Sequence, residues 1–285
     1  NTQSRPSTNI IICKNTAEKY IKDTTPMLET LITNYYEIFP DSHKYTGYVY
    51  NATLGDFFSQ LVSSTGEPFA ILGGVELPGD SENTNITDNS NVGSIKSTNT
   101  SFSKTSGSEN IGVAVFKEDK LVGELDADET LCLSIIQEQV YSFFIHIPNP
   151  EDIGKSIDLV IYPLGKKKVD VKIVNGSPYI IFKEQFTAKI LSLSQEKEYL
   201  TQGQLDSLSE IANKYLEDLM SAYLYKTSLI WGSDINDFGK YSLSNFLTTK
   251  DFEEYDWKNN YKNATFKVSL NTKVQTGFKI TEIKK

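Results

Sequence analysis

The pattern of hydrophobic and polar positions is clearest between residues 111 and 136, where it predicts a strand, a turn, a second strand and a helix. Large apolar residues alternate along residues 111–116, which is typical of a half-buried strand. The polar residues 117–120 are long enough for a hairpin loop, and residues 121–125 provide the returning strand. Because the polarity changes sharply on both sides, we interpret this stretch as the joint of the molecule.

The helix predicted after this hairpin has a recognisable first turn. Asp126 stands at the N-cap position and Glu129 follows three residues later. The Asp126 carboxylate can accept hydrogen bonds from free amides of the first turn, and Glu129 favours the positive end of the helix. One apolar face at helical spacing is then expected from Leu131, Cys132, Ile135 and Ile136.

The chain before this joint is predicted to form short strands and helices. Asn15 or Thr16 can cap a brief helix, Pro26 fits the first position of the next, and Thr53 with Asp56 resembles a third cap. Phe57, Phe58, Leu61 and Val62 would be the apolar positions of that third helix. We expect a buried strand at residues 9–13 and a strand at residues 69–77 with a bend at Gly73 and Gly74. Helices are expected up to residue 21, over residues 25–38 and after Thr53. Residues 45–50 are expected to be extended.

Residues 78–110 differ from the rest of the chain in composition. Ser, Asn, Thr, Gly and acidic residues dominate, and large apolar residues are almost absent. Such a segment cannot bury enough surface to offset the entropy of ordering it. We predict a disordered surface insertion between two strands of one sheet.

Residues 138–193 are predicted to be mostly strands, at residues 141–147, 156–163, 168–174 and 179–193. Asn175 and Gly176 give the strongest local signal, because both tolerate positive φ and favour a type I′ hairpin. A bulge in the last strand is expected near Glu184 and Gln185.

The best helix of the sequence extends over residues 205–225 and is expected to cover a sheet. Its apolar face is formed by Leu205, Leu208, Ala212, Tyr215, Leu219 and Ala222. Glu210 and Lys214, on the opposite side, form a favourable i,i+4 pair. The helix is expected to end at residues 232–234, and an alternating strand at residues 264–280 should return to the sheet begun before it.

These elements predict an α+β fold of two domains, each a mostly antiparallel or mixed sheet packed against helices. Residues 1–137 form the first domain, with the disordered insertion at 78–110, and residues 138–285 form the second. A length of 285 residues agrees with two domains of roughly 150 residues each.

Charge and length exclude some classes of protein. The net charge of −9 argues against a general nucleic-acid binder, because phosphate binding needs concentrated Lys and Arg. The one basic run, residues 166–168, is interpreted as a solvated turn between two strands. No apolar run approaches the roughly 18 residues that a membrane span needs.

The two cysteines, Cys13 and Cys132, each lie within an apolar stretch. Buried free thiols behave as small hydrophobic groups, so this is the default interpretation. A disulfide between them remains open for a protein outside the cytoplasm.

The search for catalytic, cofactor and metal sites predicts none of them. His43 lies in a polar loop and His146 in a strand, and neither shares a metal-binding motif with the cysteines. No nucleophile-elbow, dinucleotide or P-loop motif occurs. Residues 101–104 fit S-x-x-K, but they lie inside the polar insertion. The acids in residues 251–256 are interpreted as a solvated helix face, although a pair of catalytic carboxylates there or the use of His146 in a hydrolase remains an alternative.

Three separated segments together resemble the Ger(x)C family, the C subunits of nutrient germinant receptors in endospore-forming bacteria. The first is GVAVFKEDKLVGEL at residues 112–125, followed by the acidic-capped helix. The second is SDINDFG at residues 233–239, after the long helix. The third combines Trp257, Phe266 and Val268 with Thr276 and Gly277. None of the three is a catalytic signature.

The resemblance implies a non-enzymatic lipoprotein required for nutrient-triggered germination. It implies protein contacts with the membrane-spanning A and B subunits, and a lipidated N-terminal Cys, not in this sequence, that holds the protein on the extracytoplasmic face of the spore inner membrane. It carries over no catalytic residue or cofactor, and it names no germinant. The alternative is an extracytoplasmic carbohydrate- or peptide-binding module, favoured by the aromatic content of 12%.

Overall fold

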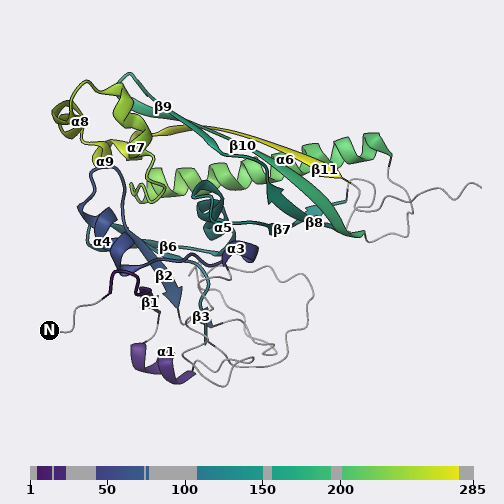
Figure 1. The fold of residues 1–285 in the computed structure, drawn as a ribbon, viewed down its shortest axis with the longest axis horizontal. Helices are drawn as coiled ribbons and strands as arrows, with labels where there is room; N and C mark the ends of the chain where they lie inside the picture. The colour runs from purple at the N-terminus through teal and green to yellow at the C-terminus, as the bar shows by residue number, and fades with distance from the viewer. Residues whose placement is uncertain are drawn as a thin grey trace, which may run out of the picture.

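The computed structural model describes residues 5–14, 16–23, 43–73, 75–76, 108–149, 156–193 and 201–275, and it shows two main sheets with helices between and beside them (Figure 1). This confirms the predicted α+β class. The helix predicted over residues 25–38, most of the predicted insertion and residues 276–280 of the closing strand lie outside the described residues. The last residues of that insertion are ordered, because β4 (Ser108–Glu109) pairs with β3 (Val75–Glu76).

The first sheet has the order β1-β2-β5-β6, and its central strands are hydrogen-bonded on both sides. β1 (Ile11–Cys13) runs parallel to β2 (Phe69–Gly73), and β5 (Val113–Lys117) and β6 (Lys120–Leu125) complete the sheet in antiparallel fashion. The predicted four-residue loop is shorter, since only Glu118 and Asp119 turn between the two strands, and Glu118 adopts a φ of 54°.

The second sheet is built around one long strand, β10 (Ser177–Leu193). β11 (Thr265–Gln275) runs parallel along one edge of β10, while β8 (Ser156–Pro163) and β9 (Lys168–Val174) share the other edge in succession. β7 (Phe143–Pro148) pairs with β8. The sheet is therefore mixed, as expected, and the closing strand does return to the sheet that precedes the long helix.

The hairpin between β9 and β10 turns at Asn175 and Gly176, which have φ values of 51° and 81° and confirm the predicted tight turn. The predicted bulge is displaced, because the register shift of β10 lies between Ile190 and Ser192. Opposite Glu184 and Gln185 the irregularity is in the partner edge, where residues 164–167 separate β8 from β9.

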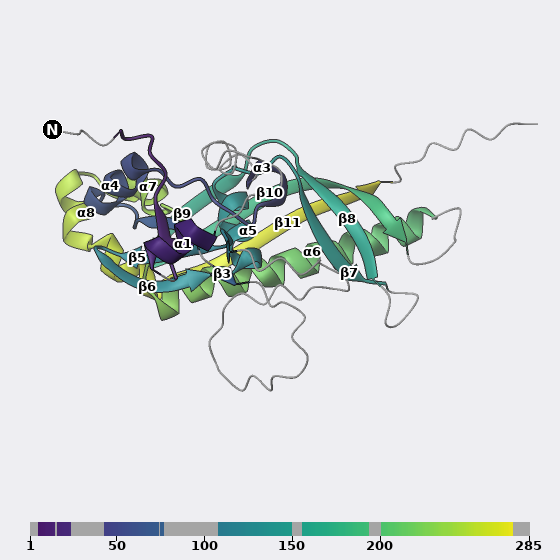
Figure 2. The ribbon, with the colours of Figure 1, turned by 90° about the horizontal axis from the view of Figure 1, so that it is seen from below.

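The long helix α6 (Gln202–Tyr225) runs along the second sheet and packs against β11 (Figures 1 and 2). Its buried face is rotated slightly from the predicted one, since Leu216, Met220 and Tyr223 are buried where Tyr215 and Leu219 were expected to be central. A π-helical turn, η2 (Lys226–Ile230), continues the helix to Gly232, which has a φ of 59°.

The helix α5 (Ala127–Ile136) lies between α6 and the first sheet. Its N-cap is the predicted one, because Asp126 and Glu129 form a capping box with bonds of 2.8 and 3.0 Å. The prediction of a single apolar face was wrong, since Leu133 and Ser134 are as buried as Leu131. A central position between two layers buries a helix on every side.

The shorter helices match the sequence less well. Thr16 and Thr53 cap their helices as predicted, but Phe58 and Val62 are 55% and 83% exposed rather than buried. The segment over residues 45–50 begins with a helical turn instead of an extended chain. These elements are α1 (Ala17–Asp23), α3 (His43–Thr46), α4 (Leu54–Val62), α7 (Gly239–Ser242), η3 (Leu243–Asn245), α8 (Thr249–Tyr255), α9 (Trp257–Asn260) and η4 (Tyr261–Asn263).

One hydrophobic core connects the two sheets. It contains Val113 and Val115 of the first sheet, Leu131 of α5, and Phe182 and Phe186 of the second sheet. The division into two domains between residues 137 and 138 stays a prediction. Because both parts contribute to one core, we propose that the division separates two folding units and not two separate cores.

Candidate functional site

A buried polar segment, residues 233–239, joins the two sheets, and we call it and its partners the junction. It begins after the left-handed Gly232, where the chain leaves η2. Ser233 donates a 2.5 Å hydrogen bond to the carbonyl of Phe116 in β5. The second segment of the family resemblance, residues 233–239, is thus bonded to the first, the hairpin at residues 112–125.

Asp234 is the centre of the junction and is 1% exposed. Its Oδ2 accepts hydrogen bonds from the backbone N–H of Gly239 at 3.0 Å and from Nε1 of Trp257 at 2.8 Å. Burial raises the pKa of this carboxyl to about 7, although the two hydrogen bonds act in the opposite direction. Asp234 therefore titrates near neutral pH inside a protein interior.

Glu67 brings the loop before β2 into the same network. The backbone N–H of Glu67 donates to the carbonyl of Asp234 at 2.9 Å. Its own carboxylate accepts from the backbone N–H of Glu118 at 2.8 Å and from Nζ of Lys258 at 3.3 Å. The Glu67 side chain is fully buried, so this ion pair is a specific connection between the first sheet and α9.

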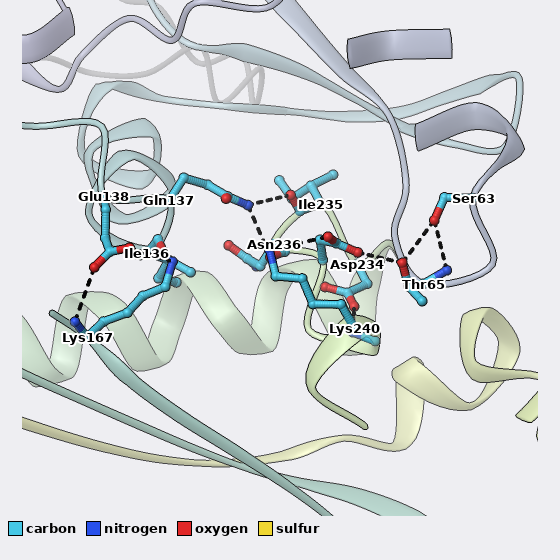
Figure 3. A network of polar contacts seen from close by, with 12 residues as sticks. Ser63, Thr65, Ile136, Gln137, Glu138, Lys167, Asp234, Ile235, Asn236 and Lys240 are labelled. Atoms are coloured by element: carbon cyan, nitrogen blue, oxygen red, sulfur yellow. Dashed lines mark hydrogen bonds and ion pairs between the residues drawn. The ribbon is translucent and has the colours of Figure 1, made fainter. Parts of the chain in front are cut away.

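Asn236 connects the junction to the two central helices. Its Oδ1 accepts a 2.8 Å hydrogen bond from the hydroxyl of Tyr223 in α6, and its carbonyl accepts from Nε2 of Gln137 at 3.0 Å. Gln137 follows directly after α5, and Figure 3 shows its amide directed at the junction. Each helix is therefore tied to the loop by one polar side chain.

Asp237 and Gly239 complete the junction on the side of the first sheet. Asp237 accepts a 2.7 Å hydrogen bond from the hydroxyl of Thr65 and forms a 3.3 Å ion pair with Lys240. A Cβ atom on Gly239 would lie 2.7 Å from the Cα of Thr65, so only glycine permits this approach of two backbones.

A second group of charges lies beside the junction, at the gap between β8 and β9 (Figure 3). Lys167 enters the interior there, donates to the carbonyl of Ile136, and lies 3.9 Å from Glu138. The interpretation of residues 166–168 as a solvated turn was therefore wrong for Lys167, whose side chain is 9% exposed. The interruption of the strand edge opposite Glu184 is what lets this side chain turn inward.

Glu184 of β10 is the buried carboxyl next to Lys167. It is 5% exposed, and burial raises its pKa to about 8 while the nearby Lys167 lowers it. The pKa of Lys167 is itself lowered, chiefly by burial. At neutral pH the Glu184 carboxyl is mostly protonated, which avoids a buried negative charge.

The candidate catalytic residues of the sequence do not lie together in the described part of the structure. His146 lies on the exposed side of β7, where its Nδ1 is 2.6 Å from Asp158 of the neighbouring strand. Cys13 and Cys132 are both free thiols, and Cys132 is fully buried. Asp251, Glu253 and Glu254 are exposed on α8, as predicted. His43 lies at the start of α3, and only its backbone is among the described parts of the structure. Residues 101–104 lie outside the described residues.

Metal-site geometry and membrane-spanning character are both judged on residues 5–14, 16–23, 43–73, 75–76, 108–149, 156–193 and 201–275. Within them, no group of three or more His, Cys, Asp or Glu side chains is arranged to hold a metal ion. In the same residues, no helix combines the length and the apolar character that crossing a bilayer requires.

The junction is chemically suited to hold segments together rather than to transform a substrate. Most of its polar groups are bonded to one another, whereas Glu67 Oε1, Asp234 Oδ1 and Asn236 Nδ2 have no hydrogen-bond partner among the described residues. The sequence patterns did not identify Glu67 as a member of the junction or Glu184 as the buried carboxyl beside it. The SDINDFG motif was a signal for Asp234, since a run of polar residues after a helix and before Phe-Gly is unusual for a simple loop. Nothing in the local sequence marked Glu67, because its partners lie far away in the chain.

Comparison with known proteins gives one family and one structure. The family model described as "Spore germination B3/ GerAC like, C-terminal" matches residues 111–277, more than half of the chain. The crystal structure of the GerBC protein superposes with a TM-score of 0.56 at 15% sequence identity, covering 95% of this chain and 69% of that one. At this identity the likeness shows the fold alone. No curated protein sequence matches the chain.

Proposed function

Because the chain belongs to the spore germination B3/GerAC-like family, we propose that it acts as the C subunit of a nutrient germinant receptor. Membership of the family connects the chain with spore germination and with germinant receptors. The finer proposal is that the subunit is required for nutrient-triggered germination and acts through protein contacts with the A and B membrane subunits.

The observation that carries this proposal is the convergence of the matched region on the junction. Phe116 of the hairpin and Trp257 of the third segment are both bound by residues of the second, through Ser233 and Asp234. Trp257 is 1% exposed, which makes it part of the core and not of a binding surface. The family pattern is thereby explained as the set of residues that fixes the two sheets in one arrangement.

A non-enzymatic role is part of the proposal. Asp234 and Glu184, the carboxyl groups with the largest upward pKa shifts, are 1% and 5% exposed. A general acid or base must lie within hydrogen-bond reach of its substrate, and these groups are enclosed by protein. Their burial supports a structural use of both.

The proposed place on the membrane is supported by membership of the family. We propose that the subunit lies on the extracytoplasmic face of the spore inner membrane, held by a lipidated cysteine that precedes residue 1. Family membership supports a spore membrane association at the coarser level.

The exposed end of α6 supports a contact with a partner protein. Leu229 and Ile230, in the π-helical turn η2, are 64% and 72% exposed. Single π-helical turns occur frequently at functional sites, and two adjacent exposed apolar side chains gain free energy when a partner covers them. We propose this turn as a contact with the membrane subunits of the receptor.

The test of the receptor role is germination of spores that lack the gene. Nutrient-triggered germination is compared with germination by an agent that bypasses receptors, and only the nutrient response should be lost. An intact nutrient response, in a strain whose other receptor genes are also removed, would contradict the proposal and bring a carbohydrate- or peptide-binding role to the front.

The contact is tested by complementing that strain with a Leu229→Ser, Ile230→Ser double variant of the full-length protein. The variant should be present at the wild-type level but fail to restore the nutrient response or to co-purify with the A and B subunits. The matched control is Leu247→Ser, which changes a side chain that is 99% exposed at another place. Full restoration by the double variant would remove η2 as the contact.

A further inference from the structure

The side of the second sheet that faces away from α6 carries a concentration of lysines, and we call it the outer face. Alternation along the strands directs one set of side chains to α6 and the other outward. The exposed positions of the outer face include no Arg and no Glu on β9, β10 or β11. Its lysines are Lys168, Lys172, Lys183, Lys189, Lys267 and Lys273.

These lysines are poorly neutralised. Lys172 lies 3.6 Å from Asp170, and Lys189 lies over the ring of Tyr162 at 5.5 Å. Within the described part of the chain, the other four lysines have no ion pair. The acidic residues of this face are Asp158 and Asp170, so it holds a net charge of +4 in a chain of net charge −9.

Two of the lysines stand directly opposite each other. Lys168 of β9 pairs in register with Lys183 of β10 on the exposed side of the hairpin. Like charges at directly opposed positions destabilise a sheet, because their Cβ atoms are only about 5 Å apart. Folding alone therefore does not account for this pair, which is better explained by an anionic partner that neutralises it.

Part of the negative charge of the molecule lies on α6, on the other side of the same sheet. Asp206, Glu210 and Asp218 are exposed on α6. If the outer face meets a planar surface, these acids are separated from it by the sheet and the helix. Charges screened over a Debye length of about 8 Å at physiological ionic strength then oppose the contact little.

The use of lysine instead of arginine on the outer face favours a charged surface over a protein as the partner. Lysine is depleted in the cores of protein interfaces, whereas arginine and aromatic residues are enriched there. Lysine carries a compact, strongly hydrated charge on a flexible stem, which suits contact with a diffuse layer of charge. Tyr162 adds an aromatic ring of the type that lies at a bilayer interface.

We propose that the outer face of the second sheet docks on the anionic phospholipid surface of a membrane. The choice of a lipid surface over another polyanion rests in part on the proposed function, since the family associates with the spore membrane. The face gives the protein a second, electrostatic attachment and fixes its orientation, with α6 and the first sheet directed away from the lipid.

The test is co-sedimentation of the purified 285-residue chain with lipid vesicles. Phosphatidylcholine vesicles are compared with vesicles that contain equal parts of phosphatidylcholine and phosphatidylglycerol. We expect binding to the anionic vesicles only, lost at high salt. A Lys168→Gln, Lys183→Gln, Lys267→Gln variant should bind roughly 100-fold more weakly, at about five-fold for each lysine near an anionic surface.

A charge-matched control separates the outer face from general electrostatics. Lys22, Lys120 and Lys214 are exposed on α1, β6 and α6, and their triple Gln variant changes the net charge by the same amount. This control should bind the anionic vesicles as well as the wild type. An equal loss in both triple variants, or equal binding to neutral vesicles, would overturn the proposal.

Competition identifies a different partner if there is one. Tighter binding of polyglutamate or of duplex DNA than of anionic vesicles, lost in the outer-face variant, would assign the face to an acidic protein or to nucleic acid and overturn the lipid proposal. Vesicle binding does not depend on a receptor, so failure here leaves the germination result intact, and the reverse also holds.

Discussion

The junction and the outer face differ in whether their charged groups are buried and paired. In the junction, most polar groups are enclosed by protein and have a particular partner, as Glu67 has in Lys258 and Asp234 has in Trp257. On the outer face, Lys168 and Lys183 are exposed and stand directly opposite each other on neighbouring strands. A buried charge costs free energy unless it is paired, whereas an exposed charge costs little and stays available.

This difference separates residues that maintain the fold from residues that can meet a partner. Substitutions in the junction should reduce the stability of the protein, since they leave a buried group unsatisfied or force two backbones apart. Substitutions of the outer-face lysines that have no ion pair should leave stability unchanged or increase it, and their effect should appear in binding. Three changes test the comparison, beginning with the largest expected effect.

Gly239→Ala should destabilise the protein by about 3 kcal/mol, because the new Cβ collides with the Thr65 backbone and cannot be relieved by a change of rotamer. Chemical denaturation measures the change in the free energy of unfolding. The control is Gly203→Ala in the first turn of α6, where a Cβ meets nothing within 4 Å. The control should be neutral or slightly stabilising, and equal losses in both variants would show that the junction backbone is not closely packed.

Glu184→Gln should change how stability depends on pH. The pKa of Glu184 is raised from an ordinary value of 4.5 to about 8 in the folded protein, so the folded state binds the proton more tightly than the unfolded state. Its contribution is fully present below pH 4.5 and is lost as the pH rises to about 8. Gln mimics the protonated form, so the variant should match the wild type at acid pH and be the more stable of the two at alkaline pH, with a difference that grows until the pH reaches about 8.

The free energy of unfolding, measured by urea denaturation from about pH 5 to about pH 9, checks this expectation. Asp234, whose pKa is raised to about 7, changes stability in the same direction and should leave some pH dependence in the variant. Glu210→Gln on the exposed side of α6 is the control and should leave the profile unchanged. A variant less stable than the wild type at the alkaline end would show that the Glu184 carboxylate is held by Lys167 as an ion pair.

Lys168→Glu should stabilise the protein by about 0.5 kcal/mol, because it replaces a like-charge pair with an opposite-charge pair facing Lys183. Thermal unfolding at low salt detects the gain, and high salt should reduce it. Lys172→Glu is the comparison, since Lys172 already lies 3.6 Å from Asp170 and should lose stability when its charge is reversed. Any loss of stability in Lys168→Glu would mean that the outer lysines contribute to the fold.

The sequence predicted elements whose determinants are local. The capping box of α5, the turn at Asn175 and Gly176, and the bounds of β8 and β9 depend on residues within a few positions of one another, and all are as expected. The amphipathic pattern of α6 also identified its role, since a helix with one apolar stripe must cover something.

The sequence did not predict features that depend on distant partners. The burial of α5 on every side is a consequence of its place between two layers, and Lys167 is buried only because the edge of the sheet is interrupted opposite Glu184. The network of Glu67 joins residues 191 positions apart in the chain. Periodicity carries no information on such pairs, whereas the family resemblance identified the hairpin, residues 233–239 and the Trp257 segment, which meet in the junction.

The continuous strand β10 has a mechanical consequence. Its 17 residues, at about 3.3 Å each, span about 55 Å, and it is hydrogen-bonded along both edges. Such a strand is stiff along its axis, so a pull on its C-terminal end, which pairs with β8, should be transmitted along the strand to Glu184 and the turn at Asn175. We expect the second sheet to resist extension along β10 and to bend most readily beside residues 164–167, where one edge of the strand is unpaired.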